Sequence, residues 1–154
     1  MDTLSHAAWG ATIVRKNPQI WWAAFFGALP DLITALYGII RYRKGYLKYL
    51  NDQAYIKSEN DDYLKVYHFF HSFIPISLFT FVLSFIDSSY LIITIPYYLH
   101  ILMDIFTHQG VWATRIFYPL SNFHFEGYNW WKHKWLSIVN WAAILVINLI
   151  FFIF

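Results

Sequence analysis

Three residues with metal-ligating side chains recur at intervals of four in the segment YYLHILMDIFTHQG, residues 97–110. They are His100, Asp104 and His108, and the positions between them are mostly apolar or aromatic. If the segment is an α-helix, each residue advances about 100°, so the three side chains lie on one stripe. Imidazole nitrogens and carboxylate oxygens are good ligands for zinc, manganese and iron, so the stripe predicts a metal site.

The spacing limits how these residues can share ions. His100 and Asp104 are one turn apart and can hold one ion together, whereas His108 lies about 12 Å along the axis from His100, too far to share that ion on a continuous helix. Two arrangements remain. Either His108 serves a second ion with Asp104 bridging, or the helix ends near Gly110 and His108 lies outside the site. The spacing leaves both open.

Four further residues of the same chemistry stand in apolar or aromatic surroundings. His68 and His71 are three apart and are expected to share a helix face, Asp31 follows a proline in an apolar segment, and His6 precedes two alanines. Unpaired polar groups in such settings are costly, which favours a common site. Because the chain has no cysteine, we expect one to three divalent ions, zinc first and otherwise manganese or iron, on His6, Asp31, His71, His100, Asp104 and His108.

Hydrogen bonding is the competing interpretation of these residues. A single buried histidine in an aromatic-rich bundle is usually a hydrogen-bonded interior residue. His100 and Asp104 could likewise form a polar clasp between two helices, as membrane bundles use. The metal interpretation is favoured because Asp31 and His71 need partners as well.

The composition indicates an integral membrane protein. Of the 154 residues, 58% are hydrophobic and 23% aromatic, whereas 13% are charged, which is too apolar for a soluble domain of this size. The length allows a single membrane-embedded domain, residues 1–154, with the metal-site core at about residues 3–125. The net charge of +2, without a basic run, gives no reason to expect a nucleic acid partner, so membrane lipids are the expected partners.

The first apolar stretch, residues 20–40, is long enough to cross a membrane but has polar interruptions. Pro30 frees backbone groups, and Asp31 places a carboxylate at mid-depth, which is costly unless it faces protein, water or a metal. We therefore expect this helix to be broken or kinked around Leu29 and Pro30.

The second apolar region, residues 69–107, is about two helices long and predicts a helical hairpin. Residues 86–89, of which three are polar, supply the turn, so both outer ends, with their histidines, return to the same side. Pro75 and Pro96 are expected to cause irregularities within the helices.

Three other segments complete an all-α bundle of about four long membrane helices plus short N-terminal and loop helices. Residues 3–16 predict a short helix with Thr3 or Ser5 as its N-cap. Residues 42–67 predict a polar, helical loop, and residues 135–154 predict a C-terminal anchor helix.

The distribution of Lys and Arg predicts the orientation. With four spans, one side of the membrane carries two of these residues, Arg15 and Lys16, and the other side carries nine. The positive-inside rule places the richer side, and with it the polar site, towards the cytoplasm of a multi-pass inner-membrane protein. The nine residues are Arg41, Arg43, Lys44, Lys48, Lys57, Lys65, Arg115, Lys132 and Lys134.

The order of these motifs resembles a known family, the bacterial membrane-bound metal-dependent hydrolases, also described as LexA-regulated, inner membrane-associated hydrolases. The resemblance covers about residues 3–125 and depends on the order and spacing of the series rather than on any one motif. The matching segments are SHAAWGA at 5–11, GALPD at 27–31, HS at 71–72, HILMD at 100–104 and YPLS at 118–121.

That family is distantly similar in motif order to zinc-dependent phospholipase C and the S1/P1 nucleases. The similarity implies that Asp31 is a bridging ligand and candidate base, that His71 is a ligand, and that His100 with Asp104 is an HxxxD pair; His6 matches an early histidine ligand. The chain has no later HxxxE pair and no equivalent of the N-terminal tryptophan ligand of those enzymes. One or two ions are therefore expected instead of three.

The resemblance implies a membrane-embedded hydrolase that acts on a phosphoester or lipid-like substrate through a metal-activated water. Asp31 and His68 are the expected catalytic residues, Asp31 as bridge or water-orienting group and His68 in the shell or on the leaving group. The alternative function is a non-catalytic metal-binding, structural or transport-related membrane protein.

Overall fold

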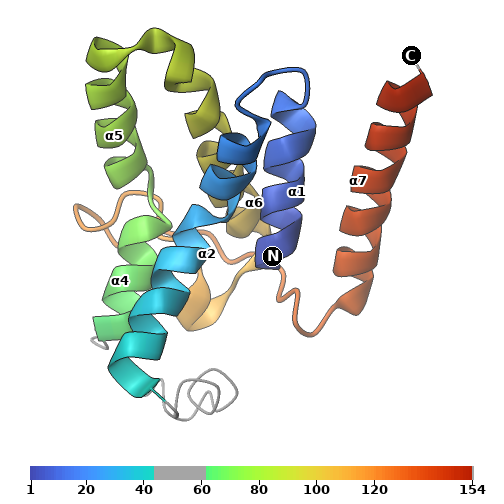
Figure 1. The fold of residues 1–154 in the computed structure, drawn as a ribbon. Helices are drawn as coiled ribbons and strands as arrows, with labels where there is room; N and C mark the ends of the chain where they lie inside the picture. Colours follow the sequence, from blue (N-terminus) through green and yellow to red (C-terminus); the bar gives the residue numbers. More distant parts are fainter. Residues whose placement is uncertain (44–61, 154) are drawn as a thin grey trace.

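The computed structural model describes residues 1–43 and 62–153, and this part of the chain is helical (Figure 1). It contains no β-strand, only an isolated bridge between Arg115 and His124. The all-α prediction is confirmed, while residues 44–61, which include most of the predicted polar loop, lie outside the described residues. The elements are α1 (Thr3–Val14), α2 (Ile20–Tyr42), α4 (Asp62–Phe70), α5 (Phe73–Ile86), the 3₁₀-helix η3 (Ser88–Thr94), α6 (Ile95–Thr107), the 3₁₀-helix η4 (Gly110–Trp112) and α7 (Lys134–Ile153).

Three helical segments are long and apolar enough to cross a membrane. They are Ile20–Tyr42, Ser88–Thr107, which joins η3 to α6, and Lys134–Phe152. Helices α4 and α5 pass the same test as a pair and are bent by 47° at the break between them, which gives up to four spans. These lengths and compositions are typical of an integral membrane protein.

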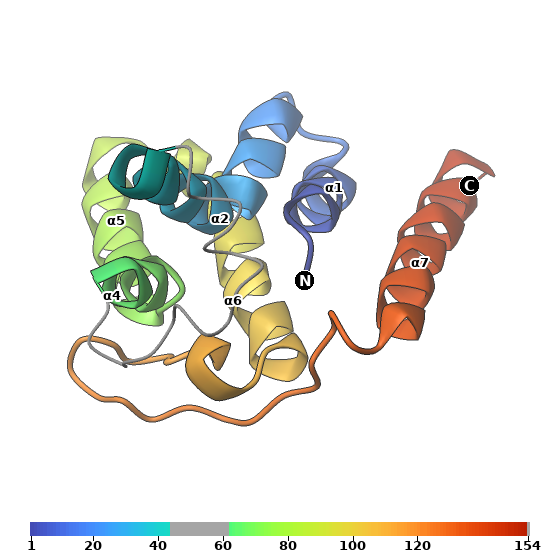
Figure 2. The same ribbon diagram turned by 90° about the horizontal axis from the view of Figure 1, so that it is seen from below.

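Helix α2 lies at the centre of the bundle and packs against α1, α4 and α6. Figures 1 and 2 show α4 and α5 on one side of α2, and α1 on the other side. Helix α7 stands beyond α1 at the edge of the molecule, and only 6% of its span is buried. The site residues predicted on α1, α2 and α6 therefore lie within the packed part of the bundle.

The sequence predicts a break or a kink around Leu29 and Pro30; helix α2 is continuous through Pro30, so the break is wrong. A proline removes one backbone donor, but packing against three neighbouring helices stabilises the helix on both sides of that position. The Pro30 carbonyl accepts a hydrogen bond from the Thr34 hydroxyl at 2.8 Å, which satisfies a polar group inside the bundle. Asp31 consequently stands within a continuous helix.

The N-cap of α1 is Asp2, so the prediction of Thr3 or Ser5 is wrong. The Asp2 carboxylate accepts from the Ser5 amide at 2.9 Å, and the Ser5 hydroxyl donates to the Asp2 carbonyl at 2.8 Å. A carboxylate satisfies the free amides of the first turn better than a hydroxyl because it also complements the helix dipole.

The predicted hairpin is present, with its turn at Asp87. Helix α5 ends at Ile86, and the Asp87 carboxylate accepts from the Ser89 amide at 2.8 Å. The returning arm begins as the 3₁₀-helix η3 and becomes α-helical at Ile95, next to Pro96 in the first turn of α6. Proline suits that position because its missing donor has no helical partner there.

Two glycines allow α1 and α2 to approach closely. A Cβ atom at Gly27 would lie 2.5 Å from the His6 carbonyl oxygen, and one at Gly10 would overlap the Ala23 carbonyl. Small residues of this kind let helix backbones pack tightly inside membranes. The crossing fixes the position of His6 relative to α2.

Candidate metal centre

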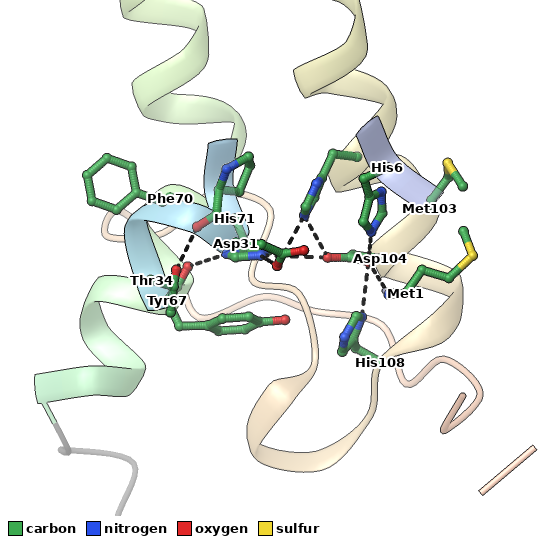
Figure 3. Close-up of polar contacts among 12 residues, drawn as sticks. Met1, His6, Asp31, Thr34, Tyr67, Phe70, His71, Met103, Asp104 and His108 are labelled. Atoms are coloured by element: carbon green, nitrogen blue, oxygen red, sulfur yellow. Dashed lines mark hydrogen bonds and ion pairs between the residues drawn. The ribbon is translucent and has the colours of Figure 1, made fainter. Parts of the chain in front are cut away.

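The structure brings all six predicted metal-ligating residues into one cluster, in which His6, His71, His100 and Asp104 are buried (Figure 3). Figure 3 shows Asp31 and Asp104 at its centre, with His71 beside Asp31 and with His6 and His108 on either side of Asp104. His6 comes from α1, Asp31 from α2, His71 from the break between α4 and α5, His100 and Asp104 from α6, and His108 from the residue that follows α6.

The two carboxylate oxygens of Asp104 face different histidines. Its Oδ1 lies 3.1 Å from His6 Nε2 and 3.3 Å from His108 Nδ1. Its Oδ2 lies 3.1 Å from His100 Nε2 and 3.7 Å from His71 Nε2. Asp104 is only 1% exposed. A carboxylate with ligand nitrogens at both oxygens has the geometry of a bridge between two ion positions.

Helix α6 ends at Thr107, and the position of His108 combines features of the two arrangements that the spacing left open. The His108 backbone is extended, with φ −120° and ψ 148°, and its ring turns back towards Asp104. The helix thus ends near Gly110 as one alternative required, yet His108 remains within reach of the cluster.

Asp31 is the more exposed of the two carboxylates. Its Oδ1 lies 3.2 Å from His71 Nε2 and 3.8 Å from His100 Nε2, and its Oδ2 has no hydrogen-bond partner among the described residues. The Asp31 side chain is 22% exposed, whereas those of His71 and His100 are fully buried. Asp31 is therefore partly exposed as a side chain, although its Oδ2 atom is buried.

Backbone carbonyls fix the tautomers of two histidines. His100 Nδ1 lies 2.7 Å from the Gly27 carbonyl oxygen, and His71 Nδ1 lies 2.9 Å from the Tyr67 carbonyl oxygen. A carbonyl only accepts, so each Nδ1 carries a proton, and in the neutral ring Nε2 presents a lone pair. Both lone pairs face carboxylate oxygens, so a proton or a cation must lie between them.

His6 completes the buried side of the cluster. Its ring stacks on that of His100, with the centroids 3.6 Å apart. Burial, assisted by the neighbouring His100, lowers the pKa of His6 from 6.5 to about 4. His6 is therefore neutral at neutral pH, which is the form in which histidine binds metal ions.

Three groups in the cluster were missing from the sequence prediction. The Met1 amine donates to Asp104 Oδ1 at 2.8 Å, and it lies 3.2 Å from the Thr107 hydroxyl. Tyr67 stacks on His71 at 4.0 Å, and its hydroxyl donates to the Trp112 carbonyl at 3.1 Å. Thr107 could have been found, because it follows Asp104 by three on the same helix face. Tyr67 could have been found in the same way, because it precedes His71 by four, whereas only the folded chain brings Met1 to the cluster.

His68 is buried, but its ring does not join the carboxylates. It packs against Tyr67 and Tyr118, with ring centroids 5.3 and 5.8 Å away. Within residues 1–43 and 62–153, no ion pair or hydrogen bond joins it to Asp31 or Asp104. The catalytic role of His68 stays a prediction.

The arrangement fits one or two divalent ions. Two sets of residues each offer ligand atoms that lie within 4.8 Å of one another. One set is His6, His100 and Asp104, and the other is Asp31, His71 and His100. Both sets use His100, which has only Nε2 to offer because Nδ1 is bonded to a carbonyl. One ion can thus take His100, and a second would depend on the bridge at Asp104. Nitrogen and oxygen donors of this kind suit zinc and manganese.

Comparison of the chain with models of protein families, with curated proteins and with solved structures finds no match. The resemblance to the membrane-bound metal-dependent hydrolases therefore stays a prediction from the motif order. The candidate site stands on its geometry alone.

Proposed function

We propose that the protein is a membrane-embedded, metal-dependent hydrolase. The observation that carries the proposal is the pair of histidines, His71 and His100, whose Nε2 lone pairs face Asp31 and Asp104 at a buried position. A divalent cation relieves this opposition of lone pairs and negative charge, and the partial exposure of Asp31 supplies access for water.

The residues divide into two roles. His71, His100 and Asp104 would hold the ion, with His6 and His108 beside the second oxygen of Asp104. Asp31, more exposed and with an unpaired Oδ2, orients a water molecule and accepts its proton. A bound divalent ion supplies Lewis acidity, which acidifies water and polarises the scissile bond.

The motif order implies a phosphoester substrate, and the surroundings of the site favour one with an apolar part, such as a lipid. The Tyr128 amide donates to the Phe106 carbonyl at 2.8 Å, and the Gly127 amide to the His108 carbonyl at 2.9 Å, so this loop lies against the end of α6. Phe106 and Tyr128 are 68% and 67% exposed. Exposed aromatic side chains at the same end of the bundle as the cluster suit an amphiphilic substrate at a membrane interface.

The proposal is tested with purified protein loaded with zinc or manganese. Phosphate monoesters, diesters and phospholipids in mixed micelles serve as substrates for the native chain, Asp31→Asn and the control His133→Gln, an exposed histidine outside the cluster. We expect chelator-sensitive hydrolysis by the native chain and the control. Loss of the general base lowers the rate about 100-fold or more in Asp31→Asn at matched metal content. Equal rates for Asp31→Asn and the native chain, or no hydrolysis by the loaded native chain, would contradict the proposal.

A second candidate function is a non-catalytic bundle held together by a polar clasp. The distances of 3.1 and 3.2 Å between histidine and carboxylate atoms can also be filled by protons on charged imidazoles. A clasp of this kind needs no metal. Its melting temperature would not change when a chelator is added, whereas a metal-bound cluster would lose stability.

A further inference from the structure

A cavity of about 440 Å³ lies between the end of α1 and α7, away from the metal cluster. Along α1, Arg15 is about 14 Å from His6, so the two sites occupy opposite ends of this helix. The lining residues are Thr12, Ile13, Arg15, Lys16, Ile147 and Phe151.

Two polar contacts hold the walls of this cavity in place. The Trp9 indole donates to the Asn140 side chain, and the Asn148 amide donates to the Thr12 hydroxyl, both at 2.8 Å. Helix α7 is otherwise almost free of protein contacts, since 6% of its span is buried. Because hydrogen bonds fix α7 against α1, the cavity beyond Thr12 is a defined feature of the fold.

The charged side chains among the described residues that line the cavity are both positive. The Arg15 guanidinium carbon lies 3.2 Å from the centroid of the Phe151 ring, and Arg15 Nη1 is buried without a hydrogen-bond partner among the described residues. Lys16 adds a second cation, and none of the described residues that line the cavity carries a carboxylate. A buried guanidinium donor without an acceptor is costly, so the site is suited to an anion with oxygen acceptors.

The apolar residues that line the cavity indicate that the anion carries an acyl chain. Ile13, Ile147 and Phe151 give the cavity an apolar side that a free anion would leave unused. Trp21 and Trp22, in the first turn of α2, are 81% and 58% exposed at the same end of the bundle. Exposed tryptophans mark the depth of lipid headgroups. We infer that this cavity binds one anionic phospholipid, with its phosphate on Arg15 and its acyl chain along α7.

The test measures lipid retention by native mass spectrometry and melting temperature in a neutral detergent. Phosphatidylglycerol, phosphatidylcholine and soluble glycerol phosphate are added separately to the full chain. We expect phosphatidylglycerol alone to be retained at one molecule per chain and to raise the melting temperature. Equal effects of phosphatidylcholine, or a full effect of glycerol phosphate, would overturn the inference.

Three variants test whether the lipid binds in this cavity. Arg15→Gln should weaken phosphatidylglycerol binding by about fivefold or more, since each basic residue contributes roughly 1 kcal/mol to such binding. Ile147→Trp keeps both cations but fills the cavity, and it should also reduce retention. Lys132→Gln, which removes an exposed cation at the other end of the molecule, is the matched control and should bind normally. Native-like binding by Arg15→Gln and Ile147→Trp would overturn the inference.

Discussion

At the scale of single residues, the buried histidines differ in the hydrogen bonds that orient their rings. His71 and His100 each donate Nδ1–H to a backbone carbonyl, at 2.9 and 2.7 Å, so their orientation is fixed before any ion binds. His68 is equally buried, but neither of its ring nitrogens has a hydrogen bond within the described residues that meets ordinary geometry. Only the first two are prepared to hold a metal ion.

His71→Gln and His68→Gln form a matched pair, because each replaces a fully buried histidine on neighbouring turns. We predict that His71→Gln weakens metal binding by about 100-fold or more, since it removes a ligand rather than a residue that only orients one. His68→Gln should bind metal as the native chain does. Competition with a chromophoric chelator measures both affinities. Equal losses of metal affinity in the two variants would show that the loss comes from replacing a buried residue and not from removing a ligand.

Part of the site could be predicted from the sequence at this scale. The pairing of His100 with Asp104 follows from one helical turn, and Asp31 was identified because a carboxylate in an apolar segment needs a partner. The Gly27 carbonyl and the Met1 amine could not be predicted, because they reach His100 and Asp104 only through helix packing.

At the scale of elements, the crossing of α1 and α2 connects packing to the cluster. Gly27 has two roles. Because it has no side chain, the His6 backbone can approach it closely, and its carbonyl accepts a hydrogen bond from His100 Nδ1. The sequence predicted both helices but placed a break at Pro30, because a local rule about proline does not include the packing of α2 against three helices. The hairpin was predictable because its turn is marked locally by Asp87 and Ser88.

Gly27→Val should separate α1 from α2. A side chain there meets the His6 carbonyl oxygen, so we predict a destabilisation of about 1–3 kcal/mol and a loss of metal affinity of about tenfold. Thermal unfolding and metal titration measure the two effects. The control is Ala142→Val on the exposed face of α7, which should change neither. An unchanged metal affinity in Gly27→Val would mean that the crossing does not position the ligands.

At the scale of the whole molecule, the cluster lies towards one end of the bundle. Helix α6 ends within one turn of Asp104, and residues 108–133 continue from that end, whereas the α5–η3 turn lies at the other (Figure 1). The count of nine basic residues against two predicts that the end with the cluster faces the cytoplasm. Of those nine, Lys44, Lys48 and Lys57 lie outside the described residues.

Single cysteines test this orientation, because the chain has none of its own. Ser89→Cys lies at the turn after α5, and Tyr128→Cys lies beside the end of α6; both positions are exposed. In intact cells, a membrane-impermeant maleimide should label Ser89→Cys at once and Tyr128→Cys only after lysis. The cysteine-free chain is the control for background. If Tyr128→Cys alone were labelled in intact cells, the orientation would be opposite to the predicted one. Equal labelling of both variants would contradict a chain that crosses the membrane between these two positions.

Metal content is the most direct measure of the central claim that the cluster is a metal site. The detergent-purified native chain, Asp104→Asn and the exposed-histidine control His133→Gln would be compared by elemental analysis after reconstitution with zinc or manganese. We predict one or two ions per chain in the native protein and in the control. Asp104→Asn should lose the ions, because both oxygens of Asp104 face ligand nitrogens. Metal at background level in the native chain, or full occupancy in a folded Asp104→Asn, would contradict it.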